Sequence, residues 1–225
     1  MKLNTFIAAL AMVGLTSASA YVNADNSASS YTRDGTAVVG AAAQLAGVVD
    51  VDGYTKVLSS ELSNSGTPKD LVIGLSFETS LFTMTMVKSK GGSKSTSTAD
   101  AEIEMYVLVD GKMAEPGIVT FDKRRQELWA SLGGVLNCVD TNLDGIVSFD
   151  ECLLTEEEIG LILDTKAAHT FNFLANNIGS GGHTIEAYAR LSKDGSVEGL
   201  GASDASASLG KGTLSVWEVQ DSVTH

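Results

Sequence analysis

One stretch of the sequence, Asp140 to Glu151, carries side chains suited to binding a hard cation. Oxygen-bearing side chains stand at alternate positions, at Asp140, Asn142 and Asp144, and are followed by Gly145 and a terminal glutamate. Calcium takes about six to eight oxygen ligands, so a short loop wraps it only if donors alternate and the chain then turns back. The stretch therefore predicts a calcium site, with magnesium a weaker candidate because it demands a tighter, more hydrated octahedron.

The stretch resembles the loop of the EF-hand family, D-x-[DN]-x-[DN]-G-x5-E, at every defining position. The resemblance implies side-chain ligands from Asp140, Asn142 and Asp144, the backbone carbonyl of Ile146, Ser148 directly or through water, and a bidentate Glu151. It also implies that Val147 and Phe149 bury apolar surface beneath the loop. The alternative is a turn rich in Asp, Asn and Gly that matches the pattern without binding metal.

The flanks depart from that family. Gly133-Gly134 lie where an entering helix should run, and no second full loop exists in the chain. We therefore expect a solitary structural site and not a paired sensor that opens a groove. Extracellular calcium modules bind at roughly 10⁻⁴ to 10⁻³ M, which suits such a stabilising role.

The N-terminus predicts export. Residues 1–20 combine Lys2, an apolar run from Phe6 to Leu15 and the small residues Ala18-Ser19-Ala20, the pattern of a signal peptide. No later stretch approaches the roughly 20 apolar residues of a membrane helix, so no membrane span is expected. The predicted location is secreted, periplasmic or at the cell surface.

Two cysteines, Cys138 and Cys152, bracket the predicted loop. An exported chain meets oxidising conditions, so we expect a disulfide that joins the ends of the loop. The alternative is a pair of free thiols held apart by diverging loop ends.

Composition and charge limit the classes of partner. The chain of 225 residues has a formal net charge of −13, which argues against nucleic acid because phosphates would be repelled. Its 23 Gly, 2 Pro and many Ser, Thr, Ala and Val residues favour short strands and tight turns over a helical bundle.

Strand patterns occur on both sides of the loop. Asp70 to Phe77 alternates in one phase, whereas Phe82, Met84 and Met86 take the opposite phase, which predicts a bulge or break near residues 79–81. Residues 88–99 lack periodicity and are predicted to form a loop. Residues 101–109 alternate cleanly, as expected of a half-buried strand.

Beyond the loop, Thr155 to Glu158 has the pattern of a capping box and predicts one short α-helix that ends around residues 165–168. Further on, Gly182-His183-Thr184-Ile185 is similar to a strand of bacterial immunoglobulin-like modules. The expected fold is mainly β: an immunoglobulin-like antiparallel β-sandwich with an inserted calcium loop and one short α-helix. Its predicted organisation is a signal peptide over 1–20, a flexible leader over 21–35 and one domain over 36–225, with the insert at about 137–168.

Catalytic patterns are sparse, so we expect no enzyme. Of the histidines, His169 and His183 are placed at strand starts and His225 ends the chain, and no nucleophile elbow, zinc-ligand spacing or phosphate loop is found. Glu102 and Glu104 could imitate a glycosidase pair, but a solvated strand face is the preferred interpretation.

Two non-enzymatic functions follow. The first is a calcium-stabilised structural or adhesive protein that assembles with itself or with other surface proteins. The second is a carbohydrate-binding module, in which Trp129, Tyr188 and Trp217 stack on a polysaccharide.

Overall fold

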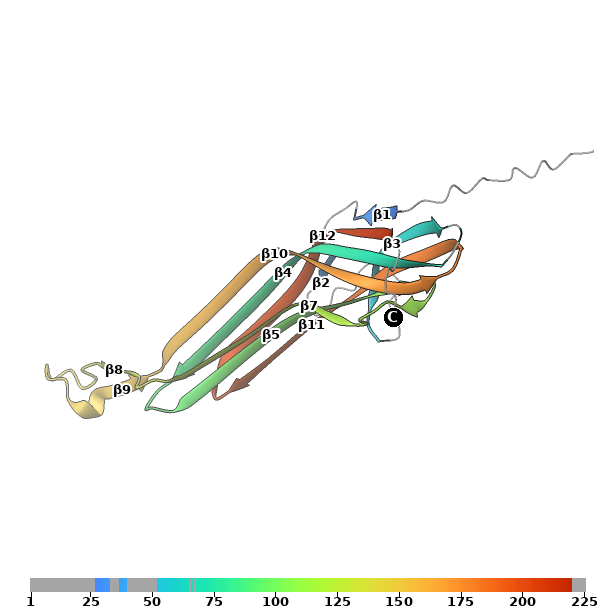
Figure 1. The fold of residues 1–225 in the computed structure, drawn as a ribbon. Helices are drawn as coiled ribbons and strands as arrows, with labels where there is room; N and C mark the ends of the chain where they lie inside the picture. The colour runs from blue at the N-terminus through green and yellow to red at the C-terminus, as the bar shows by residue number, and fades with distance from the viewer. Residues whose placement is uncertain (1–26, 33–36, 40–51, 65, 67, 220–225) are drawn as a thin grey trace, which may run out of the picture.

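The computed structural model describes residues 27–32, 37–39, 52–64, 66 and 68–219 (Figure 1). The predicted signal peptide lies outside the described residues. The chain forms strands with the following bounds: β1 (Ser27–Tyr31), β2 (Ala37–Val39), β3 (Thr55–Asn64), β4 (Lys69–Ser89), β5 (Lys94–Val109), β6 (Lys112–Met113), β7 (Val119–Ser131), β8 (Val135–Cys138), β9 (Cys152–Thr155), β10 (Glu157–Ile178), β11 (Gly181–Glu198) and β12 (Leu200–Val219). The described helical structure is a single 3₁₀ turn, η1 (Phe149–Glu151).

Two antiparallel sheets pack face to face, which confirms the predicted mainly-β sandwich (Figure 1). Sheet A has the order β1-β12-β4-β10, with β2 also paired to β12. Sheet B has the order β3-β11-β5-β6, with β7 also paired to β5. Strand β1 lies within the segment predicted as a leader, so the ordered chain begins before Thr36.

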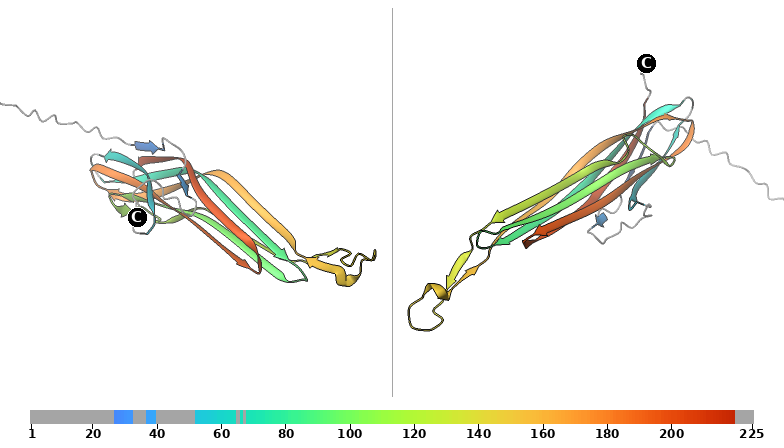
Figure 2. Two further views of the ribbon diagram at one scale, coloured as in Figure 1. Left: turned by 180° about the vertical axis from the view of Figure 1, so that it is seen from behind. Right: turned by 90° about the horizontal axis from the view of Figure 1, so that it is seen from below.

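The sandwich is elongated, because its longest strands run on past the short ones (Figure 2). We call the part that holds β1, β3 and β6 the proximal half, and the part where β4, β5, β7, β10, β11 and β12 continue the distal half. A separate two-stranded ribbon, β8 paired with β9, projects from the distal end. The loop predicted to bind calcium therefore lies at the far tip of the molecule.

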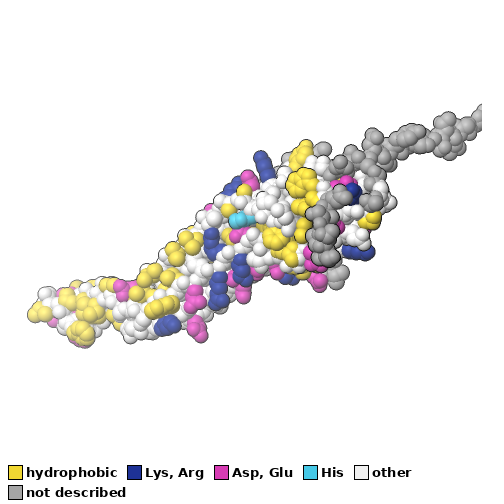
Figure 3. Space-filling view, viewed as in Figure 1, with side chains coloured by type: hydrophobic (Ala, Val, Ile, Leu, Met, Phe, Trp, Pro, Cys, Tyr) yellow, Lys and Arg dark blue, Asp and Glu magenta, His cyan; other side chains and the backbone are white. Residues whose placement is uncertain are grey.

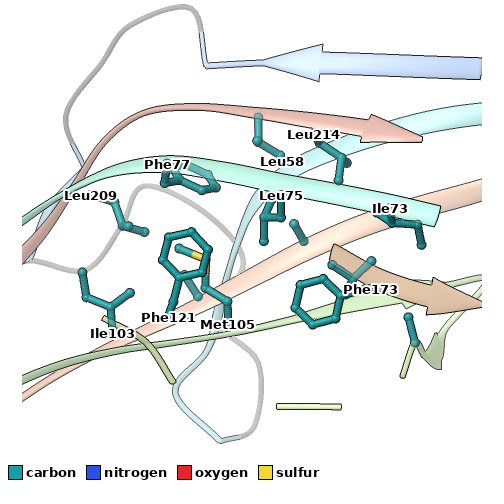
Figure 4. Packing of buried hydrophobic residues seen from close by; sticks show 14 of the residues in the cluster. Leu58, Ile73, Leu75, Phe77, Ile103, Met105, Phe121, Phe173, Leu209 and Leu214 are labelled. Carbon is teal, nitrogen blue, oxygen red and sulfur yellow. The ribbon is translucent and has the colours of Figure 1, made fainter. Parts of the chain in front are cut away.

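The proximal half holds the large apolar side chains (Figure 4). Strand β4 sends Leu71, Ile73 and Leu75 inward with no measurable exposure, and Phe173 of β10 is equally buried. Other large members of the core come from β5, β11 and β12, namely Ile103, Met105, Ile185, Leu209 and Leu214. This burial provides the main hydrophobic stabilisation of the sandwich.

Small and hydroxylated side chains line the distal half. Gln126 of β7 is buried there; its amide oxygen accepts from Thr83 at 2.8 Å, and its amide nitrogen donates to Thr85 at 2.6 Å. These bonds satisfy polar groups that would otherwise be costly to bury. Further buried small residues come from β5 and β12, namely Ser95, Ser97, Ala99, Ala101, Ala205 and Ala207.

This interior explains why two predictions are wrong. Strand β4 pairs with β10 without a register shift through residues 79–81, so the bulge is absent; Thr83 and Thr85 point inward, and the apolar set that begins at Phe82 lies on the outer face. The segment 88–99 is not a loop, because β4 runs to Ser89 and β5 starts at Lys94. Hydrophobic periodicity gives no signal where serine and threonine form the buried face.

The helix predicted after Thr155 is also wrong, because that segment forms strand β10. Its antiparallel register with β4 is continuous from Glu157 to Ala175. Glu158, interpreted as part of a capping box, instead forms a cross-strand ion pair with Lys88 at 2.8 Å. The acidic residues thus complement lysines on the neighbouring strand and its turn.

Candidate metal site at the disulfide-closed tip

The ribbon holds the predicted loop at its two ends. Strands β8 and β9 pair from Val135 opposite Thr155 to Cys138 opposite Cys152. The two cysteine sulfurs lie 1.96 Å apart, at bonding distance, as predicted. The disulfide therefore closes the segment Val139 to Glu151 at the point where strand pairing ends.

Inside the loop, the predicted side-chain ligands accept hydrogen bonds from the loop's own amides. Asp140 accepts from the N–H of Leu143 at 2.6 Å and of Gly145 at 2.8 Å. Asn142 accepts from the N–H of Asp144 at 2.9 Å, and Asp144 accepts from the N–H of Ile146 at 2.8 Å. Gly145 has a φ of 83°, which glycine adopts without strain and which allows the chain to turn here.

Glu151 joins the two sides of the loop. Its Oε1 accepts from the N–H and hydroxyl of Thr141, both at 2.9 Å, and from the N–H of Asn142 at 3.2 Å. Its Oε2 accepts from the N–H and hydroxyl of Ser148 at 2.9 and 3.1 Å. These bonds, first those from the Ser148 backbone and the Thr141 hydroxyl, lower the pKa of Glu151 to about 2.

The types of side chain in the loop suit calcium, but their arrangement suits it less well. Asp140, Asn142 and Asp144 stand along one turn, and each side-chain oxygen that accepts one N–H keeps a lone pair for a cation. Glu151 differs, because its carboxylate faces N–H and O–H donors on both sides. Among the described residues, no group of three or more His, Cys, Asp or Glu side chains is placed to hold a metal ion.

The apolar positions of the loop are not buried, contrary to the prediction. Phe149 is 81% exposed, and Val147 is 52% exposed. The reason is the position of the ribbon: it projects beyond the sandwich, so no surface lies beneath the loop (Figure 1).

The aromatic residues proposed to stack on sugars do not form one platform. Trp129 is exposed on β7 of sheet B, with the Lys94 ammonium 5.4 Å from its ring centroid. Trp217 belongs to sheet A and packs over Gly74. Tyr188, on β11, stacks on Tyr106 with a centroid distance of 5.0 Å and an interplanar angle of 7°.

The histidines occupy different settings. His169 lies within β10 and not at a strand start, with its Nε2 3.4 Å from the Asp122 carboxylate. His183 lies near the start of β11, as predicted, and its Nδ1 is 2.7 Å from the Asp110 carboxylate. His225 lies outside the described residues.

Glu102 and Glu104 are held by basic partners, Lys123 at 3.0 Å and Arg190 through its Nε at 2.8 Å. Sequence spacing gives no signal for these contacts, nor for that of His183 with Asp110, because the paired residues lie on different strands or in a distant turn.

Within the part of the chain that the structure describes, no helix is long and apolar enough to cross a membrane. Comparison with protein-family models, with curated proteins and with solved structures finds no match for this chain.

Proposed function

We propose that this protein is an exported calcium-binding β-sandwich protein with a structural or adhesive role in assembly, in which calcium stabilises the projecting tip. The observation that carries the proposal is the placement of Asp140, Asn142, Asp144 and Glu151 in one loop that a disulfide closes. Oxygen donors of this kind suit calcium, and closure of the loop keeps them together.

The side-chain oxygens that would hold calcium accept hydrogen bonds from the loop's own N–H groups. Asp140, Asn142 and Asp144 keep free lone pairs while they accept N–H bonds, so they provide the first ligands. Glu151 would serve as a further ligand if its carboxylate were released from the N–H groups of Thr141 and Ser148. Without calcium, the same carboxylate holds the loop together through those N–H groups.

The experiment compares calcium binding and amide exchange of the tip in two variants. Asp144→Asn keeps an oxygen acceptor for the N–H of Ile146 but removes one negative charge. We expect calcium affinity to fall at least about tenfold while exchange without calcium stays unchanged. Glu151→Gln removes both the ligand and the hub of hydrogen bonds, so exchange should rise even in chelator.

The matched control is Glu156→Gln, which removes a glutamate outside the loop whose ion pair with Lys90 is long, at 4.0 Å. It should leave calcium binding unchanged. Isothermal titration calorimetry reports affinity, and hydrogen exchange followed by mass spectrometry reports protection at residues 139–151. Equal exchange of the wild-type tip in millimolar calcium and in chelator would refute calcium stabilisation.

A carbohydrate-binding module stays the alternative, supported by the exposure of Trp129 (63%) and Trp217 (47%). The two indoles belong to different sheets, so each would act alone and any affinity should be weak. A glycan array tests this function, and an array on which neither Trp129→Ala nor Trp217→Ala lowers a signal counts against it.

A further inference from the structure

The tip exposes several large apolar side chains to solvent. Leu143 is 86% exposed, Phe149 81%, Leu153 74% and Ile146 71%. Figure 3 shows hydrophobic atoms gathered over this end of the molecule. We call the following residues the apolar tip: Val135, Leu136, Val139, Leu143, Ile146, Val147, Phe149, Leu153 and Leu154. Exposed apolar clusters of this kind mark interaction surfaces.

The charge of the tip restricts what can cover it. No Lys or Arg occurs from Gln126 to Thr165, whereas Asp140, Asp144, Asp150 and Glu151 lie within the tip. Surfaces that bind anionic membranes are rich in Lys and Arg, so this tip is unsuited to one. Two tips placed together would repel each other, because like charges meet.

A second feature lies partway along the sandwich, at the irregularity between Leu209 and Gly212 of β12. There a hollow of about 430 Å³ is lined largely by apolar surface, with Tyr31, Phe77 and Lys211 in its wall. We call this the β12 hollow. Its size matches pockets that take small ligands, so it has room for one or two apolar side chains.

The hollow complements the tip in charge as well as in polarity. Its carboxylate, Glu78, is paired with Lys166 at 3.5 Å. Lys211 forms no ion pair with any described residue, so it adds an uncompensated positive charge at the rim. Tyr31, 65% exposed, offers an aromatic face beside it.

A chain cannot place its tip in its own hollow. His169, in the wall of the hollow, lies twelve residues beyond Glu157, the first residue of β10, which is about 40 Å at roughly 3.3 Å per residue. The ribbon also points away from the sandwich (Figure 1).

We propose that the apolar tip of one molecule docks in the β12 hollow of a second copy, with Phe149 and Leu143 as the anchoring side chains and Lys211 facing the tip carboxylates. The inference rests on the proposed function, because it names the partner of the tip that calcium would stabilise. Two different surfaces meet, so the contact is heterologous and adds molecules head to tail, in a ring if the rotation between copies closes and in an open filament if it does not. Calcium supports the contact by stabilising the loop that carries the two anchoring side chains.

The test uses sedimentation velocity of the exported protein in millimolar calcium, across a range of concentrations. The tip variant is Leu143→Ser with Phe149→Ser, and the hollow variant is Tyr31→Ser with Lys211→Glu. The control is Met113→Ser with Ile118→Ser, which removes two exposed apolar residues outside both surfaces. Circular dichroism confirms that each variant is folded.

We expect wild type and control to form species that grow with concentration, and each variant alone to associate at least about tenfold more weakly. An equimolar mixture of the two variants should form dimers and nothing larger. The hollow variant supplies an intact tip, the tip variant supplies an intact hollow, and the remaining two surfaces are damaged.

Wild-type protein that stays monomeric, a tip variant that still assembles, or a mixture that forms no dimers would each overturn the inference. Calcium-dependent binding of wild type to vesicles of neutral and anionic lipid that the tip variant loses, without self-association, would assign the tip to a membrane instead. If the protein binds calcium but does not assemble, the docking inference is rejected and the proposed calcium site stands. If assembly persists in Asp144→Asn and in chelator, docking stands and the role of calcium is rejected.

Discussion

Glu151 shows how one side chain can satisfy two different patterns. Its position relative to Asp140 and Gly145 predicts a terminal calcium ligand. In the structure the same carboxylate accepts hydrogen bonds from Thr141, Asn142 and Ser148, which keeps its pKa near 2. Sequence spacing identifies the oxygen donors, but it does not reveal how the loop's own N–H groups compete for them.

His183 offers a second case of side chains joined across distant segments. Its Nδ1 contacts Asp110 at 2.7 Å, and its Nε2 lies 2.9 Å from the carbonyl of Gly179. The hydrogen bond to Asp110 raises the pKa of His183 above 6.5, although burial opposes the shift. Burial alone would raise the pKa of Asp110, but the bonds from His183 and Thr184 lower it below 3.8.

These shifts predict a window of pH for stability. Because the pKa of His183 is raised in the folded protein, its protonated form stabilises the fold below about pH 6.5. This contribution is lost as pH rises through the folded-state pKa of His183. The lowered pKa of Asp110 stabilises it above about pH 4, and this contribution is lost as pH falls. His183→Gln should therefore cost about 1–2 kcal/mol near pH 5 and less near pH 9. Urea unfolding at both pH values measures the difference; an equal loss at both would contradict the ionic role.

At the scale of elements, the ribbon depends on its crosslink. Strands β8 and β9 have four residues each and pair only with each other, and isolated two-stranded ribbons are marginally stable. Replacing Cys138 and Cys152 by alanine should lower the local stability of the ribbon by about 3 kcal/mol, the chain-entropy value for a loop of this size.

The residue pair just before the ribbon is held to the body by the Gly91 N–H, which donates to the Gly133 carbonyl at 2.8 Å. In the variant without the disulfide, amide hydrogen exchange should accelerate within residues 135–155 and stay unchanged in β4 and β5. Acceleration spread equally over the sandwich would mean that the disulfide stabilises the whole fold.

Strands β12 and β4 approach each other so closely at Gly201 that the position requires a residue without a side chain. A Cβ there would lie 2.2 Å from the Met86 carbonyl oxygen, a backbone atom that cannot move without disturbing β4. We expect Gly201→Ala to destabilise the protein by about 1–3 kcal/mol, the usual cost of overpacking. Gly182→Ala is the control, because a Cβ at that position meets nothing within 4 Å. Thermal unfolding of both variants tests the difference, and equal midpoints would contradict it.

The elements also show where prediction from sequence succeeds and fails. The strand over 101–109 is predictable, because Ile103, Met105 and Val107 alternate with other residues, among them the half-buried Glu102 and Glu104, and pack into a large apolar core. Strand β10 is not, because its acidic start imitates a helix cap while its partner lysines lie more than sixty residues away. Cross-strand charge pairs leave no local signal.

On the scale of the whole molecule, the two halves differ in what they bury. The proximal interior contains mainly Leu, Ile and Phe, whereas the distal interior contains mainly Ala, Ser, Thr and Gln126, with Leu81 and Val87 as its larger apolar members. Hydrophobic stabilisation grows with apolar area, at roughly 25 cal/mol per Å², so the distal half gains less per residue. Its hydrogen bonds keep buried polar groups satisfied but contribute only about 1 kcal/mol each.

Strand β4 makes this difference measurable, because one strand spans both halves and pairs with β10 and β12 along most of its length. We expect amides of Leu81 to Val87 to exchange at least about tenfold faster than those of Leu71 to Phe77, since less apolar burial opposes local opening. Nuclear magnetic resonance of the exchanging protein resolves the two segments. Equal rates would show that the sandwich opens as one unit. A gradient would instead mean that the tip is carried on the softer half, which lets it adjust to a docking surface while the proximal core stays intact.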